Sequence, residues 1–336
     1  MAGPGSGMVA EVRTGARLHF GLLATSAEQG RPGGIGMMID RHGFVLRARL
    51  AEQDSIIADA ATAVRVRRFL DRLRTGLEPW PDAAGQRYRI EVDEVIPPHR
   101  GFGSGTQLAF AMASATAKLL GFKAVPLKCL DRGTRSLVGG LGFSRGGFVI
   151  DAGEGAAAGL SAAIEATAPC QFGGHVLSVP EDWRFVIIDP TTQSGISGVE
   201  EESAFAGLNA FPAATSEKLA RLITEAIVPG LSRKEFERFA AGVSEFNRLV
   251  GEQFAPAQRG VYAHPLIREL SKRLGESDWP YLAQSSWGPA ATVFCESEVS
   301  AAALCRFLSD CLPADAARIF VAAPRNRGAD VTHHAA

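Results

Sequence analysis

Apolar and polar residues alternate along several segments of this chain, and a period of two is typical of half-buried β-strands. The alternation predicts strands at residues 9–23, broken by a turn at Gly15, and at 33–40, 43–51 and 87–95. Turn residues at 41–43 separate two of these segments, which predicts a hairpin. Shorter continuous apolar runs predict buried strands at 183–190, 292–295 and 318–323.

Apolar residues recur at helical spacing elsewhere. The predicted helices run from Asp54 or Ser55 to about Leu73, and over 108–120, 216–228, 232–250, 265–274 and 298–311. Asp54 or Ser55 is expected to cap the first helix, and Gly121 to end the second. The expected buried face of the first helix is Ile56, Ala60, Val64, Phe69 and Leu73. Its other face carries Arg65, Arg67, Arg68, Arg72 and Arg74, which is either a solvated surface or a binding face.

A glycine-rich stretch, residues 97–106, links the strand at 87–95 to the helix that follows. Glycines in such a turn permit positive φ and a close approach of the main chain to a ligand. Ser104 or Thr106 can cap the helix, whose first N–H groups have no internal acceptor and lie at the positive end of its dipole. The alternatives are a plain tight turn and a phosphate site. The phosphate-binding candidates are Gly101, Gly103, Ser104, Gly105 and Thr106.

Three further places carry candidate chemistry. Arg17 and His19 lie two residues apart on a predicted strand and therefore share a face, which is either solvated or able to meet an anion. Asp151 follows an apolar strand after a second glycine-rich stretch, so it is either a turn residue or a ligand for a hydroxyl or Mg²⁺. The polar sequence QSSW at 284–287 lies in an otherwise apolar region, which packing alone explains poorly.

Composition and charge limit the classes of protein to which this chain can belong. The chain has 336 residues, 46% hydrophobic and 21% charged, which suits one large or two ordinary globular domains. Its net charge of −1 gives no reason to expect a nucleic-acid or anionic-membrane partner. The five cysteines form no CxxC pair, which indicates reduced thiols in a cytoplasmic protein. We expect no signal peptide, because residues 1–8 are glycine-rich and lack a charged-then-apolar order. We expect no membrane span, because no apolar run reaches ~20 residues.

Several separated segments, in order along the chain, resemble a known family. Residues 100–109 (RGFGSGTQLA) resemble the second motif of the GHMP kinase superfamily, with Phe102 in place of a leucine, and this variant is similar to the β-ribofuranosylaminobenzene 5′-phosphate synthases. Residues 16–23 (ARLHFGLL) resemble the family's SRLHFGLLD, and 284–290 (QSSWGPA) its QSSWGPT. Similar matches occur at 146–153, 183–190, 195–202 and 256–262, so the resemblance covers about residues 9 to 324.

The resemblance implies an α+β fold of two lobes, with a ribosomal S5 domain 2-like N-terminal lobe and a ferredoxin-like C-terminal lobe. We assign the N-terminal lobe to residues 1–168, the C-terminal lobe to 169–326 and a flexible tail to 327–336. His333 and His334 in that tail are interpreted as surface rather than as a metal site. Glu200, Glu201 and Glu202 either begin a helix or reach a metal or an amine.

The resemblance also implies a reaction. Phosphoribosyl pyrophosphate is condensed with 4-aminobenzoate, or with 4-hydroxybenzoate, releasing pyrophosphate and CO₂, in tetrahydromethanopterin biosynthesis. The catalytic candidates are Arg17, His19, Arg135 and Trp287. Arg132 joins the glycine loop as a phosphate ligand, and the substrate-binding candidates are Asp151, Gln284, Ser285 and Ser286. Mg²⁺ is expected only with the pyrophosphate, no organic cofactor is expected, and a homodimer is expected.

Two other functions remain open at this stage. One is an ATP-dependent GHMP small-molecule kinase, although kinases of the superfamily carry a catalytic aspartate in the region that matches residues 135–145, where this chain has none. The other is a descendant of the fold that binds a phosphate ligand without turning it over.

Overall fold

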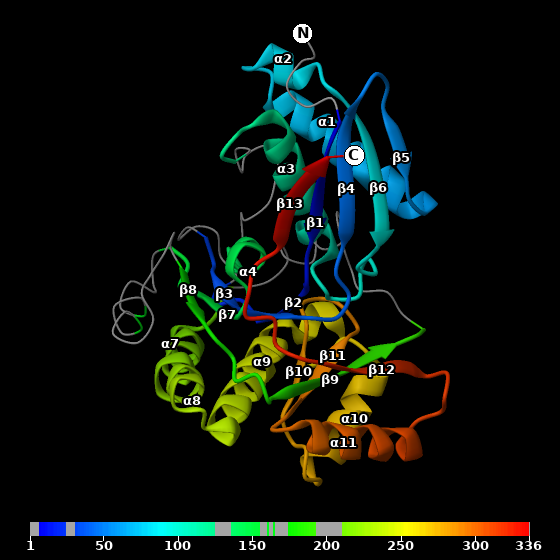
Figure 1. Cartoon of the computed structure of the whole chain (residues 1–336). Coiled ribbons are helices and arrows are strands. Elements are labelled where there is room, and N and C mark those ends of the chain that lie inside the picture. Colours follow the sequence, from blue (N-terminus) through cyan, green and yellow to red (C-terminus); the bar gives the residue numbers. More distant parts are fainter. Residues whose placement is uncertain are drawn as a thin grey trace.

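The computed structural model describes residues 7–24, 31–124, 136–154, 160, 164, 174–192 and 210–335. Three β-sheets organise these residues. A five-stranded sheet stands at one end of the molecule, a four-stranded sheet covered by α10 and α11 forms the other end, and a second four-stranded sheet lies between them (Figure 1).

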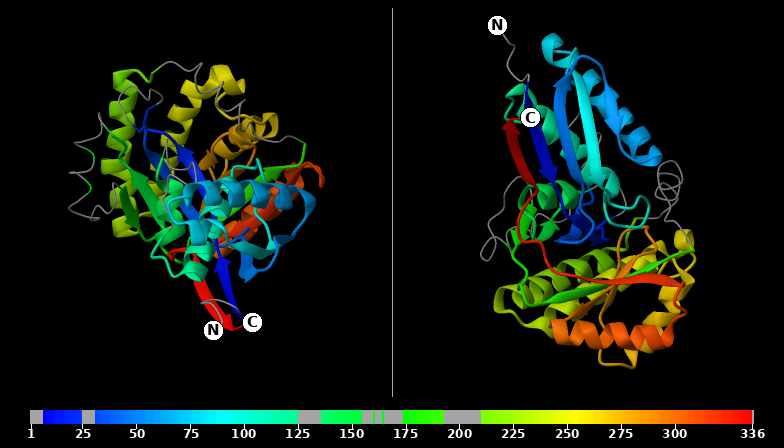
Figure 2. Two further views of the ribbon diagram at one scale, coloured as in Figure 1. Left: turned by 90° about the horizontal axis from the view of Figure 1, so that it is seen from above. Right: turned by 45° about the vertical axis from the view of Figure 1, so that its right-hand side comes forward.

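The five-stranded sheet has the order β13-β1-β4-β6-β5. Its strands are β1 (Met8–Arg13), β4 (Val45–Ala51), β5 (Ser55–Ile57), β6 (Arg87–Glu94) and β13 (Asp330–Ala335). Neighbours are antiparallel except β5 and β6, which run parallel. Helix α3 (Ser104–Leu120) packs on β1 and β4, and α1 (Ala60–Gly76) packs on α3 and β5, with the short α2 (Pro81–Ala84) beside α1 (Figure 2).

The middle sheet, of order β2-β3-β7-β8, is antiparallel throughout. Its strands are β2 (Ala16–Gly21), β3 (Gly34–Ile39), β7 (Phe148–Asp151) and β8 (Gly174–Leu177), and α4 (Val138–Arg145) packs against it. Phe20 of β2 and Phe148 of β7 stack with ring centroids 6.2 Å apart. Phe294 contacts the Phe20 ring, Phe239 contacts the Phe148 ring, and Phe239 and Phe294 also contact each other. One aromatic core therefore joins the middle sheet to the lower sheet.

The lower sheet has the order β10-β11-β9-β12. Its strands are β9 (Arg184–Pro190), β10 (Leu282–Gln284), β11 (Ala291–Cys295) and β12 (Ala317–Ala322), with helices α10 (Pro265–Gly275) and α11 (Glu298–Cys311). Three more helical segments, α7 (Ala213–Leu222), α8 (Val228–Arg233) and α9 (Phe236–Gln258), complete the described chain, and a π-helical turn at Ile223–Ile227 joins the first two. α9 packs on both β2 and β10, so it bridges two sheets.

The sequence located most strands correctly, but two predictions within residues 33–73 are wrong. Residues 33–51 do not form a hairpin, because β3 pairs with β2 and β7 while β4 pairs with β1 and β6. The first helix starts later than predicted, because β5 occupies Ser55–Ile57 and the Asp59 side chain caps α1 by accepting the N–H of Thr62 at 3.0 Å. The buried face also differs from the predicted one, because Val66 and Leu70 are buried whereas Val64 is 62% exposed.

The C-terminal residues are not the flexible tail that we predicted. Asp330–Ala335 forms β13, which pairs antiparallel with β1 along its whole length. The first sheet is therefore built from both ends of the chain, as the red and dark blue strands in Figure 1 show. The predicted lobe boundary at 168/169 lies outside the described residues, yet β8 beyond it pairs with β7, so the middle sheet takes strands from both sides. Within the described ranges, none of the helices has the length and apolar content needed to cross a bilayer.

Candidate active site

The glycine loop between β6 and α3 is held in a conformation that requires glycine. Gly101 has φ 96° and Gly103 has φ 72°, and Gly103 is the N-cap of α3. Gly103 has no side chain with which to cap the helix, and neither Ser104 nor Thr106 takes that position, so the prediction that one of them caps it is wrong. The Ser104 hydroxyl instead donates to the carbonyl of Ile96 at 2.7 Å. The first N–H groups of α3 therefore lack the usual side-chain acceptor at a helix N-terminus.

The loop presents main chain rather than side chains to its surroundings. Gly101, Gly103, Gly105 and Thr106 are each partly exposed, whereas the Phe102 ring is buried. Hydrogen bonding within the helix begins with the N–H of Gln107, which bonds to the carbonyl of Gly103 at 3.0 Å. The N–H groups that precede it lie at the positive end of the helix dipole, which suits an anion.

Strand β2 brings Arg17 and His19 to this loop. The Arg17 N–H bonds to the carbonyl of Phe102 at 3.0 Å. A Cβ placed on Gly103 would lie 3.0 Å from Cβ of Arg17 and 3.1 Å from its Nε, so the loop and the arginine are already in close contact. The absence of a side chain at Gly103 is what permits this approach.

The QSSW segment closes the arrangement from the lower sheet. The fully buried Ser285 hydroxyl donates to the carbonyl of Gly101 at 2.7 Å and accepts the N–H of His19 at 2.9 Å. The N–H of Ser286 bonds to the carbonyl of His19 at 2.8 Å, and Arg17 Nη2 donates to the Ser286 hydroxyl at 3.0 Å. Three segments far apart in the sequence are thus fastened to one another by direct hydrogen bonds.

Of the four QSSW residues, only Ser286 and Trp287 are partly exposed. The Trp287 ring lies 4.8 Å from that of Phe254 in a T-shaped arrangement, which fixes its orientation. Gln284 is buried and structural, since its side chain accepts the N–H of Ala263 at 2.6 Å and donates to the carbonyl of Ser286 at 2.8 Å. The geometry therefore makes Gln284 and Ser285 positioning residues, and leaves Ser286 and Trp287 for contact with a substrate.

Asp151 lies next to a different helix. It is fully buried, and its carboxylate accepts the main-chain N–H of Leu137 at 2.7 Å and that of Gly153 at 3.0 Å, and pairs with Arg31. Leu137 is the N-cap of α4. A carboxylate with these partners holds α4 and Arg31 in place, so the geometry favours this positioning role over the predicted contact with substrate.

Two residues that were not among the predicted site residues also shape the site. Arg65 of α1 lies on the face that the sequence assigns either to a solvated surface or to binding, and it reaches the start of α3, where Nη2 donates to the Ser104 hydroxyl at 2.8 Å. Asn247 of α9 is buried and bonds the carbonyls of Phe20 and Gln284 at 2.7 and 2.9 Å. A polar amide on the apolar face of α9 was the available signal for Asn247. Arg65 gave no such signal, because four other arginines share its face.

A buried ion pair anchors the loop from behind. Arg100, only 8% exposed, donates from Nε to Asp189 of β9 at 2.6 Å. The pair ties the residue before Gly101 to the lower sheet. Because breaking a buried pair leaves an uncompensated charge, this contact resists displacement of the loop.

His19 is 7% exposed and carries no charge at neutral pH. Burial, together with the positive charge of Arg17, lowers the pKa of His19 well below its ordinary value. A neutral imidazole can accept a proton or a hydrogen bond, whereas the protonated ring can only donate. The site therefore combines a cationic, amide-lined half with a neutral proton acceptor.

Some predicted residues lie outside the described ranges. These are Arg132, Arg135 and the three carboxylates at 200–202. Among the residues that are described, no group of three or more His, Cys, Asp or Glu side chains is arranged to hold a metal ion.

Comparisons with known proteins agree with the motifs. Residues 61–138, which contain the glycine loop and most of α1 and α3, match the family described as GHMP kinases N terminal domain. The chain is 26% identical to the β-ribofuranosylphenol 5′-phosphate synthase of Methanothermobacter thermautotrophicus, covering 95% of this chain and 97% of that protein. It is 24% identical to the synthase of the same name from Methanocaldococcus jannaschii, covering 84% and 88%. The predicted resemblance to these synthases is therefore confirmed.

Solved structures confirm the fold. Homoserine kinase from Cytophaga hutchinsonii aligns with a TM-score of 0.60 at 16% identity, covering 96% of this chain and 97% of that one. Mevalonate diphosphate decarboxylase from Staphylococcus aureus aligns with a TM-score of 0.65 at 12% identity, covering 97% and 98%. At such identities the likeness concerns the fold and not the reaction. The α+β, GHMP kinase-like fold is the one that the motifs implied.

Proposed function

We propose that this chain is an enzyme of the β-ribofuranosylphenol 5′-phosphate synthase type, which joins phosphoribosyl pyrophosphate to a 4-substituted benzoate. The observation that carries the proposal is the set of hydrogen bonds joining Arg17, the glycine loop and the 285–286 segment. These bonds hold helix-terminal amides and an arginine together, a combination suited to a departing diphosphate.

The chemistry needs few protein groups. The bond between the anomeric carbon of the ribose and the pyrophosphate oxygen breaks, and pyrophosphate leaves with the electron pair. The ring carbon that bears the carboxylate supplies electrons to the anomeric carbon and forms the new carbon–carbon bond. The carboxylate then leaves as CO₂, and its bonding pair restores the aromatic ring. No side-chain nucleophile takes part.

The first half of the reaction places negative charge on the leaving diphosphate. The open amides at the start of α3, the Arg17 guanidinium and Arg65 beside Ser104 lie where they can meet that charge. Fixed donors of this kind stabilise developing charge without reorganising during the reaction. Arg132 and Arg135 remain proposed as further phosphate ligands.

The second half concerns the benzoate. A neutral His19 can accept the proton of a 4-hydroxyl group, which would push electrons toward the ring carbon that attacks. Trp287, partly exposed and fixed against Phe254, offers a ring surface on which a benzoate can lie. The names of the relatives contain phenol, which supports 4-hydroxybenzoate over 4-aminobenzoate as the acceptor.

We further propose that Mg²⁺ enters as part of the substrate complex. Mg²⁺ is commonly held by substrate phosphates with few protein ligands. It would neutralise diphosphate charge there, and the protein residues would bind the remaining oxygens.

The test is an incubation of the purified protein with phosphoribosyl pyrophosphate and carboxyl-labelled 4-hydroxybenzoate, with 4-aminobenzoate and ATP in parallel reactions. Equal amounts of pyrophosphate and labelled CO₂ are expected with the preferred benzoate. Formation of ADP from ATP without CO₂ release in the benzoate reactions would instead support a kinase. Binding of phosphoribosyl pyrophosphate without any turnover would support a non-catalytic protein.

A further inference from the structure

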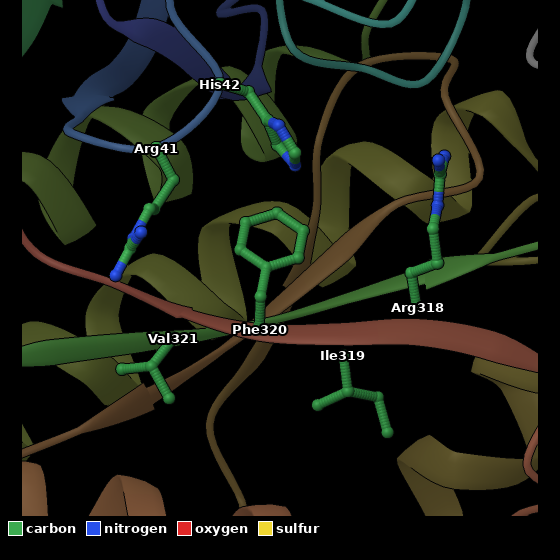
Figure 3. A pocket seen from close by; sticks show the side chains of 6 residues that line it. All are labelled: Arg41, His42, Arg318, Ile319, Phe320 and Val321. Atoms are coloured by element: carbon green, nitrogen blue, oxygen red, sulfur yellow. The ribbon is translucent and has the colours of Figure 1, made fainter.

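A second cationic surface lies behind the glycine loop, over the edge strand β12. It is a depression lined by Arg41, His42, Arg318, Ile319, Phe320 and Val321. In Figure 3, Arg41 and Arg318 stand on either side of Phe320, and His42 points down toward the Phe320 ring. Ile319 and Val321 point to the opposite side of the strand, where they pack in the lower core. The depression therefore joins the β3–β4 connection to the lower sheet.

The histidine at its centre is held in an uncommon conformation. His42 has φ 58°, a left-handed value that few residues other than glycine adopt. Its ring meets that of Phe320 edge-on at 4.5 Å and lies 5.5 Å from the ring of Phe102, the buried residue of the glycine loop. These contacts fix the imidazole between the two arginines.

The positive charge here is only partly balanced. Arg318 is 58% exposed and donates to Asp189 at 2.5 Å, but the same carboxylate also receives Arg100. Asp40, next to Arg41, accepts the main-chain N–H of Ala323 at 2.8 Å. Arg318 and Arg100 thus share one carboxylate, and the other nearby carboxylate, that of Asp40, accepts a main-chain N–H.

We propose that this depression is a second anion site, separate from the glycine loop, that binds a diphosphate or another phosphate-bearing small molecule. Two guanidinium groups on opposite sides of one ring suit an anion with charged oxygens on both sides. A single planar carboxylate would be satisfied by one of the two arginines. This inference does not depend on the proposed reaction, because none of the residues that would bind the anion contributes to that mechanism.

His42 provides a direct readout. Burial, followed by the positive charge of Arg318 and then that of Arg41, lowers the pKa of His42, while Asp189 opposes the change. An anion bound between the arginines would offset their charge and raise the pKa of His42. The imidazole signal, assigned with His42→Gln, can be followed by NMR as pyrophosphate or orthophosphate is added to the whole protein at constant ionic strength.

We expect a saturable rise in the pKa of His42 with pyrophosphate, and a weaker response to orthophosphate. Arg41→Gln should weaken the response about tenfold, as loss of a charge-assisted hydrogen bond implies. Arg318→Gln should do the same, but it also disturbs Asp189, so Arg41→Gln is the deciding variant. Arg233→Gln, an exposed arginine of α8, is the matched control and should leave the response unchanged.

Gly103→Val separates the two sites, because a side chain at Gly103 would meet Arg17 and none of the residues that line the depression. The His42 response should persist in that variant, and its loss would place the anion at the loop and overturn the proposal. An unchanged response in Arg41→Gln, or an equal response to chloride at matched ionic strength, would also overturn it.

Discussion

Two glycine-rich stretches in this chain open two neighbouring helices, and they differ in how the helix N-termini are satisfied. At α4, the protein supplies its own acceptors, because Asp151 receives the N–H of Leu137 and the Ser136 hydroxyl receives that of Val138. At α3, the N-cap is Gly103, and none of the side chains that the structure describes is seen to accept an N–H of the first turn. The two helix starts are in contact, since a Cβ on Gly139 would lie 2.6 Å from Cγ2 of Thr106.

The difference shows what makes a helix N-terminus useful for binding. Both ends carry the same partial positive charge. The Asp151 carboxylate neutralises the N-terminus of α4 and holds that helix in place. The N-terminus of α3 keeps its partial charge, which is then available to a ligand. Glycine content in the sequence does not distinguish these cases, because the deciding acceptor comes from another strand.

The largest effect is expected at Asp151, which holds the start of α4 in place. Asp151→Asn should lower the free energy of unfolding by about 3–5 kcal/mol, as breaking a buried ion pair does, because Arg31 and the start of α4 lose their counter-charge. Urea denaturation measures this. Asp59→Asn at the cap of α1 is the control and should change little, since asparagine caps equally well. If Asp151→Asn kept full stability yet lost substrate affinity, direct substrate contact would be the better assignment.

On the binding side, Gly103→Ala should lower kcat/KM by about 100-fold, the cost of misplacing one anion donor. The new Cβ would lie 3.0 Å from Arg17 at a φ of 72°, so the loop or the arginine must move. Gly121→Ala is a close control, because Gly121 ends the same helix at φ 71° with open space around it. That variant should cost about 1–2 kcal/mol of stability and leave kcat/KM unchanged. Equal kinetic losses in both variants would remove the special role of the loop.

A smaller effect is expected for Arg65→Gln. It should weaken binding of phosphoribosyl pyrophosphate by about tenfold, since one charge-assisted hydrogen bond near the start of α3 is lost. Calorimetry at two salt concentrations measures the affinity and its salt dependence. Arg67→Gln, an exposed position on the same helix, should bind as the unaltered protein does. A tenfold loss in both variants would instead indicate a general electrostatic effect of α1.

The smallest effect concerns pH. The lowered pKa of His19 means that, as pH falls below the value of a free histidine, the unfolded chain takes up a proton that the folded chain does not. The contribution of neutral His19 to the free energy of unfolding is therefore complete above about pH 6.5, and it declines as the pH falls toward the pKa of folded His19. The melting temperature should fall between pH 7 and pH 5, and less steeply in His19→Gln. His42 and His264, whose pKa values are also lowered, keep part of the dependence.

His334→Gln on the exposed face of β13 is the control for this titration and should follow the unaltered protein. An unchanged slope in His19→Gln would show that the ring of His19 is not held neutral by its surroundings.

The sequence by itself determined the α+β class, most helices and strands, and the segments that form the site. The helical spacing of apolar residues in α10 and α11 indicates which side of each helix is buried. The loop at 101–106 is rich in glycine, and a glycine-rich link between a strand and a helix is typical of few local structures. Arg17, His19, the glycine loop and the QSSW segment were predicted as one site, and the structure brings them into hydrogen-bond contact.

Only the tertiary structure decided which groups remain open. Asp151 holds the start of α4 because it accepts the N–H of Leu137 and pairs with Arg31. Arg65 contacts the start of α3 through the Ser104 hydroxyl, and the last strand pairs with the first. Each of these outcomes depends on a contact between residues distant in the sequence. Local patterns carry no information about such partners, and the energy of a polar group depends on the partner it meets.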